Sequence, residues 1–244
     1  YRIVAIDLPV HGLTEAPLDY QPSIEAFVEH VETMAAALDL EKFTLIGSSM
    51  GGNTSWQYAR KYPNRLDGLV LVGASGWPET ETDMENEPLI FKLISNPWLG
   101  PILQKIDMTD QIRNGLKASF VDQSLVTDDM VQRYSDLARA PGHRKGLFDI
   151  MMSKREHATD EKLSVVSAPT LILHGDKDNL VPVRFASLYE NAIPDARAII
   201  YEGVGHLPQE EIPNGSLADL AAFLTELQMP LPNTNDQALE SAEH

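Results

Sequence analysis

The 244-residue chain has no cysteine, and basic residues are scarce. The absence of cysteine excludes disulfide bonds and thiolate chemistry, although it does not identify a cellular compartment. The 19 Lys and Arg residues are outnumbered by 36 Asp and Glu residues, which gives a formal net charge of −17. Because no basic stripe is present, we expect no nucleic-acid partner, and an acidic membrane surface would repel the chain.

Long apolar runs are also missing. None approaches the roughly 20 residues that a membrane-spanning helix needs, so we expect no transmembrane segment. With 43% hydrophobic residues, the chain is long enough for one α/β core and an insertion. It opens at Tyr1 rather than at methionine, so we expect a missing N-terminal portion that would include any signal peptide. A cytoplasmic location is the default expectation.

Short apolar runs alternate with helix-compatible segments along most of the sequence. We predict buried strands at Tyr1–Leu8, Phe43–Ile46, Leu66–Ala74, Ala168–His174 and Ala196–Tyr201. We predict helices from about Ile24 to Leu38, with Ser23 as N-cap, from Ser49 to Tyr62, from Pro182 to Tyr189 and from Ser216 to Leu227. This alternation of apolar strands with helices is typical of an α/β fold with a mostly parallel sheet and helices on both faces.

The pattern changes between residues 76 and 162, where no strand is predicted and prolines interrupt helix-like pieces. We interpret residues 76–162 as a helical cap inserted between a first part of the core, residues 1–75, and a second part, residues 163–228. Residues 229–244 form a polar tail that contains prolines.

One stretch after the second predicted strand has the spacing of a nucleophilic serine. The segment GSSMG, residues 47–51, fits G-x-S-x-G, with a strand before it and a helix after it. In that context Ser49 occupies a strained turn that exposes its hydroxyl at the carboxyl end of the sheet. Side chains at positions 47 and 51 would collide with neighbouring backbone, so glycine is expected at both. A chance match is the alternative, but the strand–turn–helix context favours a nucleophile.

A serine nucleophile needs a base, and the seven histidines differ in their surroundings. His206 lies in a glycine-flanked loop, GVGHLP, directly after a predicted strand. His174 ends an apolar strand, where a packed imidazole with satisfied hydrogen bonds is the simpler interpretation. We therefore take His206 as the candidate base. Asp176 and Asp178, which both follow the strand ended by His174, are the candidates for the carboxylate that orients it.

Four segments together resemble the α/β-hydrolase family, and specifically its capped, serine esterase- and lipase-like branch. They are IDLPVHG, LIGSSMGG, LHGDKDNLVP and GVGHLPQEE, and the resemblance extends over nearly all of the chain except the predicted cap and tail. It implies an α/β-hydrolase fold with a catalytic triad of Ser49, Asp178 and His206, since the family carboxylate is the last residue of G-x-x-D. Asp176 then serves the turn by bonding backbone amides. The resemblance implies neither a metal nor an organic cofactor.

The sequence departs from the family pattern at two places. The loop after the first strand in this chain is usually D-x-x-G-x-G, but Val10 stands in place of one glycine, a change that concerns backbone geometry rather than catalysis. The family also has three strands before the position of Tyr1, so we expect N-terminal strands of the fold to be absent and a gap to lie beside the Phe43 strand. The Met50 amide is expected to supply one oxyanion-hole donor, and a segment upstream of Tyr1 the second. The His11 loop imitates that second donor but follows the wrong strand.

The resulting hypothesis is a serine hydrolase that cleaves carboxylic esters of small to medium hydrophobic substrates through an acyl-enzyme on Ser49. One alternative is hydrolysis of carbon–carbon bonds in vinylogous diketones, because S-M-G-G also occurs in such relatives. Their acidic substrates would prefer a cationic pocket, whereas we interpret the basic residues of the predicted cap, Lys117 among them, as solvated surface charges. The other alternative is a non-catalytic protein that binds a small hydrophobic ligand.

Overall fold

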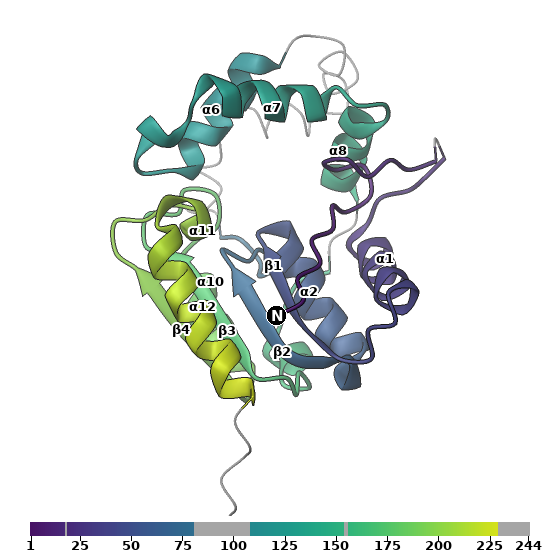
Figure 1. The fold of residues 1–244 in the computed structure, drawn as a ribbon, viewed down its shortest axis with the longest axis vertical. Coiled ribbons are helices and arrows are strands. Elements are labelled where there is room, and N and C mark those ends of the chain that lie inside the picture. The colour runs from purple at the N-terminus through teal and green to yellow at the C-terminus, as the bar shows by residue number, and fades with distance from the viewer. Residues whose placement is uncertain (18, 81–107, 154–155, 229–244) are drawn as a thin grey trace, which may run out of the picture.

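A parallel four-stranded sheet forms the centre of the described part of the chain, residues 1–17, 19–80, 108–153 and 156–228 of a computed structural model (Figure 1). Its strands are β1 (Phe43–Ser48), β2 (Leu66–Val72), β3 (Thr170–Gly175) and β4 (Ala196–Tyr201), and they lie side by side in sequence order. Every neighbouring pair is parallel. All four strands therefore end at the same edge of the sheet, and the α/β architecture predicted from the sequence is confirmed.

Helices cover both faces of this sheet. One face packs against α2 (Met50–Lys61) and α10 (Arg184–Ala192), with α1 (Ile24–Ala37) outside α2 and α9 (Asp160–Leu163) nearby. The other face packs against α12 (Pro213–Gln228), whose Phe223 contacts a cluster of buried β2 and β3 residues. Successive β2 residues alternate between these two cores, as a pleated strand buried on both faces requires: Leu69 and Leu71 belong to the first, Val70 and Val72 to the second.

The first helix shows how closely local signals set its boundary. The Ser23 hydroxyl accepts a hydrogen bond from the Ala26 amide at 3.1 Å, and α1 starts at the next residue, Ile24. Phe27 and Val31, four residues apart, both face the core. The predicted N-cap and helix are confirmed.

The predicted strand Tyr1–Leu8 is wrong. This segment belongs to none of the described strands, and Tyr1, Ile3 and Val4 are exposed, with Ile3 87% accessible. Only its end approaches the core, where Ile6 and Leu8 pack against buried residues. An apolar pattern makes a strand only where a neighbouring strand accepts its backbone hydrogen bonds, and no described strand pairs with this segment.

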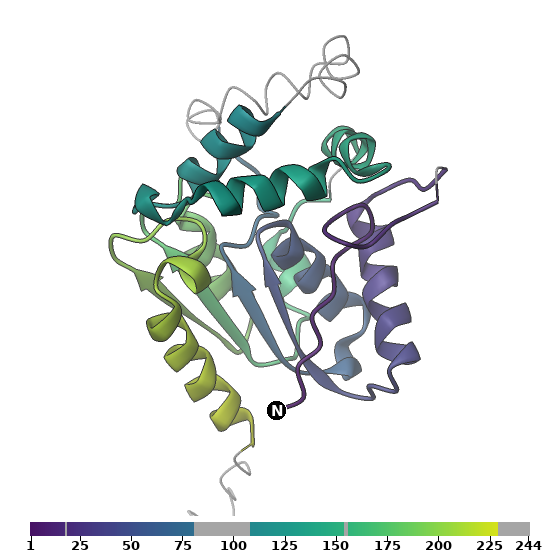
Figure 2. The same ribbon diagram turned by 45° about the horizontal axis from the view of Figure 1, so that its top comes forward.

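A second group of helices lies above the carboxyl ends of the strands (Figures 1 and 2). It comprises α6 (Thr109–Ser119), α7 (Asp128–Ala138) and α8 (His143–Met152), with a short 3₁₀ turn, η2 (Gln123–Leu125), between α6 and α7. The segment leaves and rejoins the core at one place, because the Ala158 amide donates to the Gly76 carbonyl at 2.8 Å. We call α6, α7 and α8 the upper helices. They fall within residues 76–162, whose assignment as a cap domain stays a prediction; residues 81–107 and the predicted tail, 229–244, lie outside the described residues.

The N-terminal loop meets the upper helices at Val10. Val10 has φ = 61°, a left-handed conformation that glycine adopts easily and a β-branched residue does not. Its buried side chain fills the space beside Gly146 of α8, where an added Cβ would overlap the Val10 side chain. The loop thus keeps a glycine-like backbone at a cost of about 1–3 kcal/mol, which the packing on α8 must offset.

Candidate active site

Ser49 occupies the turn between β1, which ends at Ser48, and α2, which begins at Met50. Its backbone angles, φ = 54° and ψ = −115°, are strained for a residue with a side chain. The end of β2 holds this turn, since the Ser49 amide donates to the Val72 carbonyl at 2.9 Å. The strained strand-to-helix turn expected from G-x-S-x-G is present.

The two glycines that flank this turn are not equivalent. An added Cβ at Gly47 would overlap the Gly51 carbonyl oxygen and the Ser55 hydroxyl, so glycine is required there. At Gly51 an added Cβ would meet no heavy atom of the described residues within 4 Å, apart from its chain neighbours and its own helix backbone, and the predicted collision at that position is wrong. The reason is that Gly51 borders a cavity rather than packed backbone.

Asp178 and His206 form a buried pair at the carboxyl edge of the sheet. The His206 Nδ1–H donates to Asp178 Oδ2 at 2.7 Å, and the Asp178 side chain is fully buried. The other oxygen, Oδ1, accepts from the Leu180 and Val181 amides at 2.8 Å each. Burial raises the pKa of Asp178, but hydrogen bonds from His174, from His206 and from the Val181 amide outweigh burial and hold that pKa well below its ordinary value. The carboxylate is therefore charged at neutral pH.

A second imidazole approaches the same carboxylate oxygen. His174 Nε2 lies 3.2 Å from Asp178 Oδ2 and 3.1 Å from the Val181 carbonyl oxygen. A carbonyl can only accept, so this nitrogen carries a proton and directs it at both oxygens. His174 is buried and hydrogen-bonded as the sequence indicated, but sequence reasoning missed that its partner is Asp178. The only signal is its position, four residues before Asp178 at the end of β3.

His206 lies against the end of β2, which also holds the turn of Ser49. Its side chain is buried, and an added Cβ at Gly73 would stand 3.0 Å from the His206 carbonyl oxygen and 3.2 Å from Nδ1. Gly73 follows Val72, the residue whose carbonyl accepts the Ser49 amide. Among the described residues the Ser49 hydroxyl makes no hydrogen bond, so the described contacts join Asp178 to His206 but do not link Ser49 directly to either of them.

Asp176, the alternative carboxylate, faces elsewhere. It accepts hydrogen bonds from the Gly203 amide at 2.6 Å and from the Lys177 ammonium at 2.7 Å. The Lys177 contact is the largest cause of its lowered pKa. Asp176 thus ties the loop after β3 to the loop after β4.

Glu211, which the sequence analysis did not single out, joins the loop of His206 to the upper helices. It ends α11 (Pro208–Glu211), and its Oε2 accepts from the Gly205 amide at 2.6 Å. Its Oε1 accepts from the Val121 and Asp122 amides, both at 2.8 Å, just beyond α6. The His206 amide adds a direct bond to the Ser119 carbonyl at 2.8 Å. Three hydrogen bonds therefore join these two segments, and the bond from Gly205 holds Glu211 within its own segment; we call this set of four the α6–loop junction.

We expect Glu211→Gln to lower kcat by about 10- to 100-fold, because a small displacement of a reacting group has costs of that order. Glutamine keeps one acceptor oxygen, so at least one of the three amides loses its partner next to His206. Steady-state kinetics of Glu210→Gln, which alters an exposed neighbour in the same helix, provide the matched control. Equal kcat values for the two variants would contradict a positioning role for Glu211.

Ser49 borders a cavity of about 460 Å³ between the N-terminal segment, α1, β1 and α2. The lining includes Met50, the predicted oxyanion donor, whose backbone amide lies in the first turn of α2, where amides lack intrahelical partners. The cavity lies between the unpaired segment at Ile6 and Leu8 and the edge of β1 at Ile46. This is where the sequence analysis expected a gap in the sheet.

His11 also lines this cavity, and sequence reasoning set it aside as a loop residue after the wrong strand. Its Nδ1 bonds the Pro9 carbonyl at 3.0 Å, and its ring meets Phe27 edge to face. Burial lowers the pKa of His11, and the nearby His143 lowers it further. The imidazole is therefore neutral at neutral pH, and it adds a polar group to the cavity of Ser49.

Two further observations bear on ligands and membranes. Within the described ranges, no group of three or more His, Asp or Glu side chains is placed to hold a metal ion. None of the helices in those ranges combines the length and apolar character needed to cross a membrane.

Comparison with known proteins shows the family to which the fold belongs. The model of the family described as alpha/beta hydrolase fold matches residues 1–213. A 2-hydroxy-6-oxononadienedioate/2-hydroxy-6-oxononatrienedioate hydrolase of Comamonas testosteroni is 29% identical, over 86% of this chain and 72% of the relative. A 2-hydroxy-6-oxo-6-phenylhexa-2,4-dienoate hydrolase of Burkholderia cepacia is 28% identical over the same shares. The solved structure of a thermophilic esterase from Thermogutta terrifontis superposes with a TM-score of 0.69 at 22% identity, covering 91% of this chain and 79% of that one.

The chain belongs to the alpha/beta hydrolase fold family, since the family model spans most of it. We accordingly class the protein as a hydrolase.

Proposed function

We propose that the protein is a serine hydrolase in which Ser49 is the nucleophile, His206 the general base and Asp178 the carboxylate that orients it. The observation that carries this proposal is the buried 2.7 Å bond from His206 to Asp178, at the sheet edge where Ser49 lies in a strained turn. A carboxylate on Nδ1 leaves Nε2 free to take the serine proton, and it stabilises the imidazolium that results. The missing hydrogen bond to Ser49 is compatible with this role, because such bonds often tighten only when substrate binds.

The reaction then proceeds through an acyl-enzyme. Ser49 Oγ adds to a substrate carbonyl while His206 takes its proton, and the first amide of α2, that of Met50, donates to the oxyanion. Collapse of the tetrahedral intermediate breaks the bond to the leaving group, which receives the proton from His206. Water, activated by His206, then adds to the acyl carbon and releases a carboxylic acid and the free Ser49 hydroxyl.

For the bond that is broken, we propose a carbon–carbon bond next to a ketone, in 2-hydroxy-6-oxo-dienoates. The support is the pair of curated relatives at 28–29% identity, both named as hydrolases of such compounds. In these substrates the bond between carbons 5 and 6 breaks, and carbon 5 leaves with the electron pair. Conjugation with the keto form of the 2-hydroxydienoate stabilises this carbanion before its protonation. We therefore propose carbon–carbon bond hydrolysis in place of the ester hydrolysis inferred from the sequence.

Ester hydrolysis is the second candidate, and the Ser49 cavity favours it. Its described lining is mainly apolar and contains no Lys or Arg side chain; Asp7 and His11 are its titratable groups. A dienoate carboxylate would lack a cationic partner there, and Asp7 would repel it, whereas a neutral ester avoids this cost.

One assay decides between these bonds. Purified protein is given 2-hydroxy-6-oxo-6-phenylhexa-2,4-dienoate, p-nitrophenyl acetate and p-nitrophenyl octanoate, with Ser49→Ala as the blank. We expect kcat/KM for the dienoate to exceed that for either ester by at least about 100-fold, or 2.7 kcal/mol of transition-state stabilisation. The opposite ratio would establish the esterase. Absence of turnover together with failure of an organophosphonate to label Ser49 would overturn the hydrolase proposal and favour a ligand-binding protein.

A further inference from the structure

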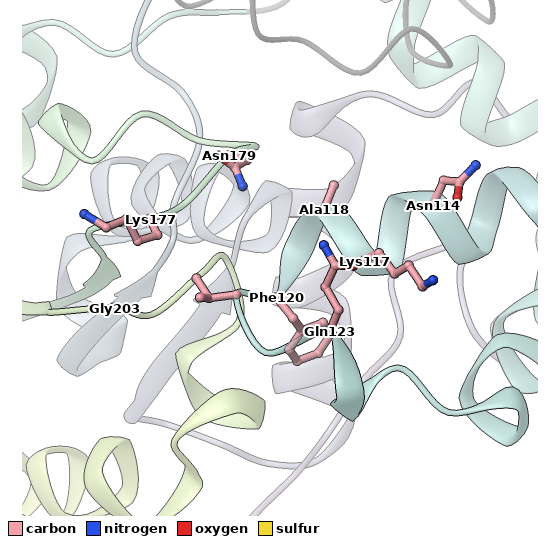
Figure 3. A pocket seen from close by; sticks show the side chains of 9 residues that line it. Asn114, Lys117, Ala118, Phe120, Gln123, Lys177, Asn179 and Gly203 are labelled. Carbon is pink, nitrogen blue, oxygen red and sulfur yellow. The ribbon is translucent and has the colours of Figure 1, made fainter.

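A second cavity among the described residues does not include Ser49. It has a volume of about 700 Å³, within the range of small-molecule sites. Figure 3 shows its lining side chains. On one side are α6 and the turn that follows it, with Lys117 and Phe120; on the other are the loops after β3 and β4, with Lys177, Asn179 and Gly203. None of its lining residues borders the cavity of Ser49.

The charge of this lining is opposite to that of the protein. The chain has a formal net charge of −17, yet the nine lining residues include two lysines and no carboxylate. Asp122 and Asp176, which neighbour the lining in sequence, already accept hydrogen bonds, from Ser124 and from Gly203 respectively. At least one oxygen of each carboxylate is therefore engaged with the protein itself.

Among the lysines whose surroundings the structure describes, Lys117 alone has no carboxylate partner in the described part of the chain. The other five each have a carboxylate oxygen within 4.0 Å: Lys42, Lys61, Lys145, Lys162 and Lys177. Lys117 has none in the described part of the chain, although its side chain is half-buried. An ammonium with no carboxylate beside it remains available to pair with an opposite charge, so this position favours an anionic ligand.

The other lining side chains indicate what further groups such an anionic ligand would carry. Asn114, Gln123 and Asn179 offer amide donors that can bind carboxylate oxygens. Ala118 and the exposed Val121 offer an apolar surface for a ring or short chain. We propose that this cavity binds a small organic acid, a carboxylate on a compact apolar body, at a site separate from that of Ser49.

The position of the site connects it to the reacting groups. Lys177 and Asn179 flank Asp178 in sequence, and Phe120 and Val121 belong to the segment that the α6–loop junction joins to His206. A bound acid would bridge α6 and the loops that hold Asp178 and His206. Its binding nevertheless needs no turnover, so it can be tested independently of the proposed function.

The test is an NMR titration of the ¹⁵N-labelled full chain with phenylacetate and with its neutral analogue phenylacetamide. We expect phenylacetate to shift the side-chain amides of Asn114 and Asn179 and the backbone amide of Gly203. Phenylacetamide should bind at least about 10-fold more weakly. Raising NaCl should weaken the binding of phenylacetate, because salt screens an ion pair at a partly exposed site.

Variants identify the cation. Lys117→Met keeps the aliphatic stem and should raise the dissociation constant at least about 10-fold, whereas Lys117→Arg should retain binding. Lys145→Met, in the upper helices but paired with Asp149, is the matched control and should leave binding unchanged, as should Ser49→Ala. Equal binding of the neutral analogue, no effect of Lys117→Met, or shifts confined to Gly47 and Gly51 beside Ser49 would each overturn the proposal.

Discussion

Ser49→Ala is expected to lower kcat by about a million-fold, to the level left by binding and oxyanion stabilisation alone. The variant removes the only hydroxyl on the strained turn between β1 and α2, and with it the acyl-enzyme route. Because Ser49 Oγ makes no hydrogen bond among the described residues, folding loses little. The measurement is kcat on whichever substrate class the wild-type protein turns over, with the melting temperature alongside.

Two neighbouring substitutions make this test specific. Ser48→Ala removes a hydroxyl one residue earlier, whose closest described partner is Gln209 at 3.5 Å, and should keep kcat within a few-fold of wild type. Ser49→Gly should be as inactive as Ser49→Ala but more stable by about 1 kcal/mol, because glycine accepts φ = 54° without strain. Full activity in Ser49→Ala would show that another group is the nucleophile.

The fold could be predicted where local pattern and tertiary context agree. Two apolar runs, Phe43–Ile46 and Leu66–Ala74, correspond to strands β1 and β2, which pair with each other in the sheet. Tyr1–Leu8 has a similar pattern and forms no described strand, since strand formation depends on a partner that the pattern itself does not reveal. At Val10 the reverse holds: a residue unsuited to a left-handed backbone keeps it because Gly146 makes room.

Some residues of the candidate site could be found from the sequence, and others could not. Its place in a loop after a strand pointed to His206, and the family resemblance favoured Asp178 over Asp176. The side chains of His206 and Asp178 are in contact; their catalytic roles stay predictions. His174 and Glu211 could not be found from sequence because their importance lies in which atoms they meet across the fold. In the sequence, His174 is only the last residue of an apolar strand, and Glu211 is only one of 36 acidic residues.

Asp178→Asn is expected to lower kcat by about 10,000-fold without changing the shape of the site. Four donors converge on this carboxylate, from His206, His174 and the Leu180 and Val181 amides. An asparagine amide offers one acceptor oxygen, so its NH₂ group must face a donor or force an imidazole into the other tautomer. Because the pKa of Asp178 is held below its ordinary value, the wild-type carboxylate stays charged through mildly acidic pH, and low activity in the variant should persist across that range.

The lowered pKa of Asp178 also predicts how the stability of the folded protein depends on pH. A carboxyl group with a lowered pKa stabilises the folded state fully above its ordinary value of 3.8, and this contribution is lost as pH falls through the folded-state pKa. Wild type should therefore unfold at a higher temperature than Asp178→Asn at pH 7, and the difference should shrink below about pH 4. Asp176→Asn is the matched control, since Asp176 is bonded to Gly203 and Lys177 but not to His206, and it should keep kcat within about 10-fold of wild type. If Asp176→Asn proved the more damaging variant, Asp178 would lose its assigned role, because the buried bond to His206 would then be structural rather than catalytic.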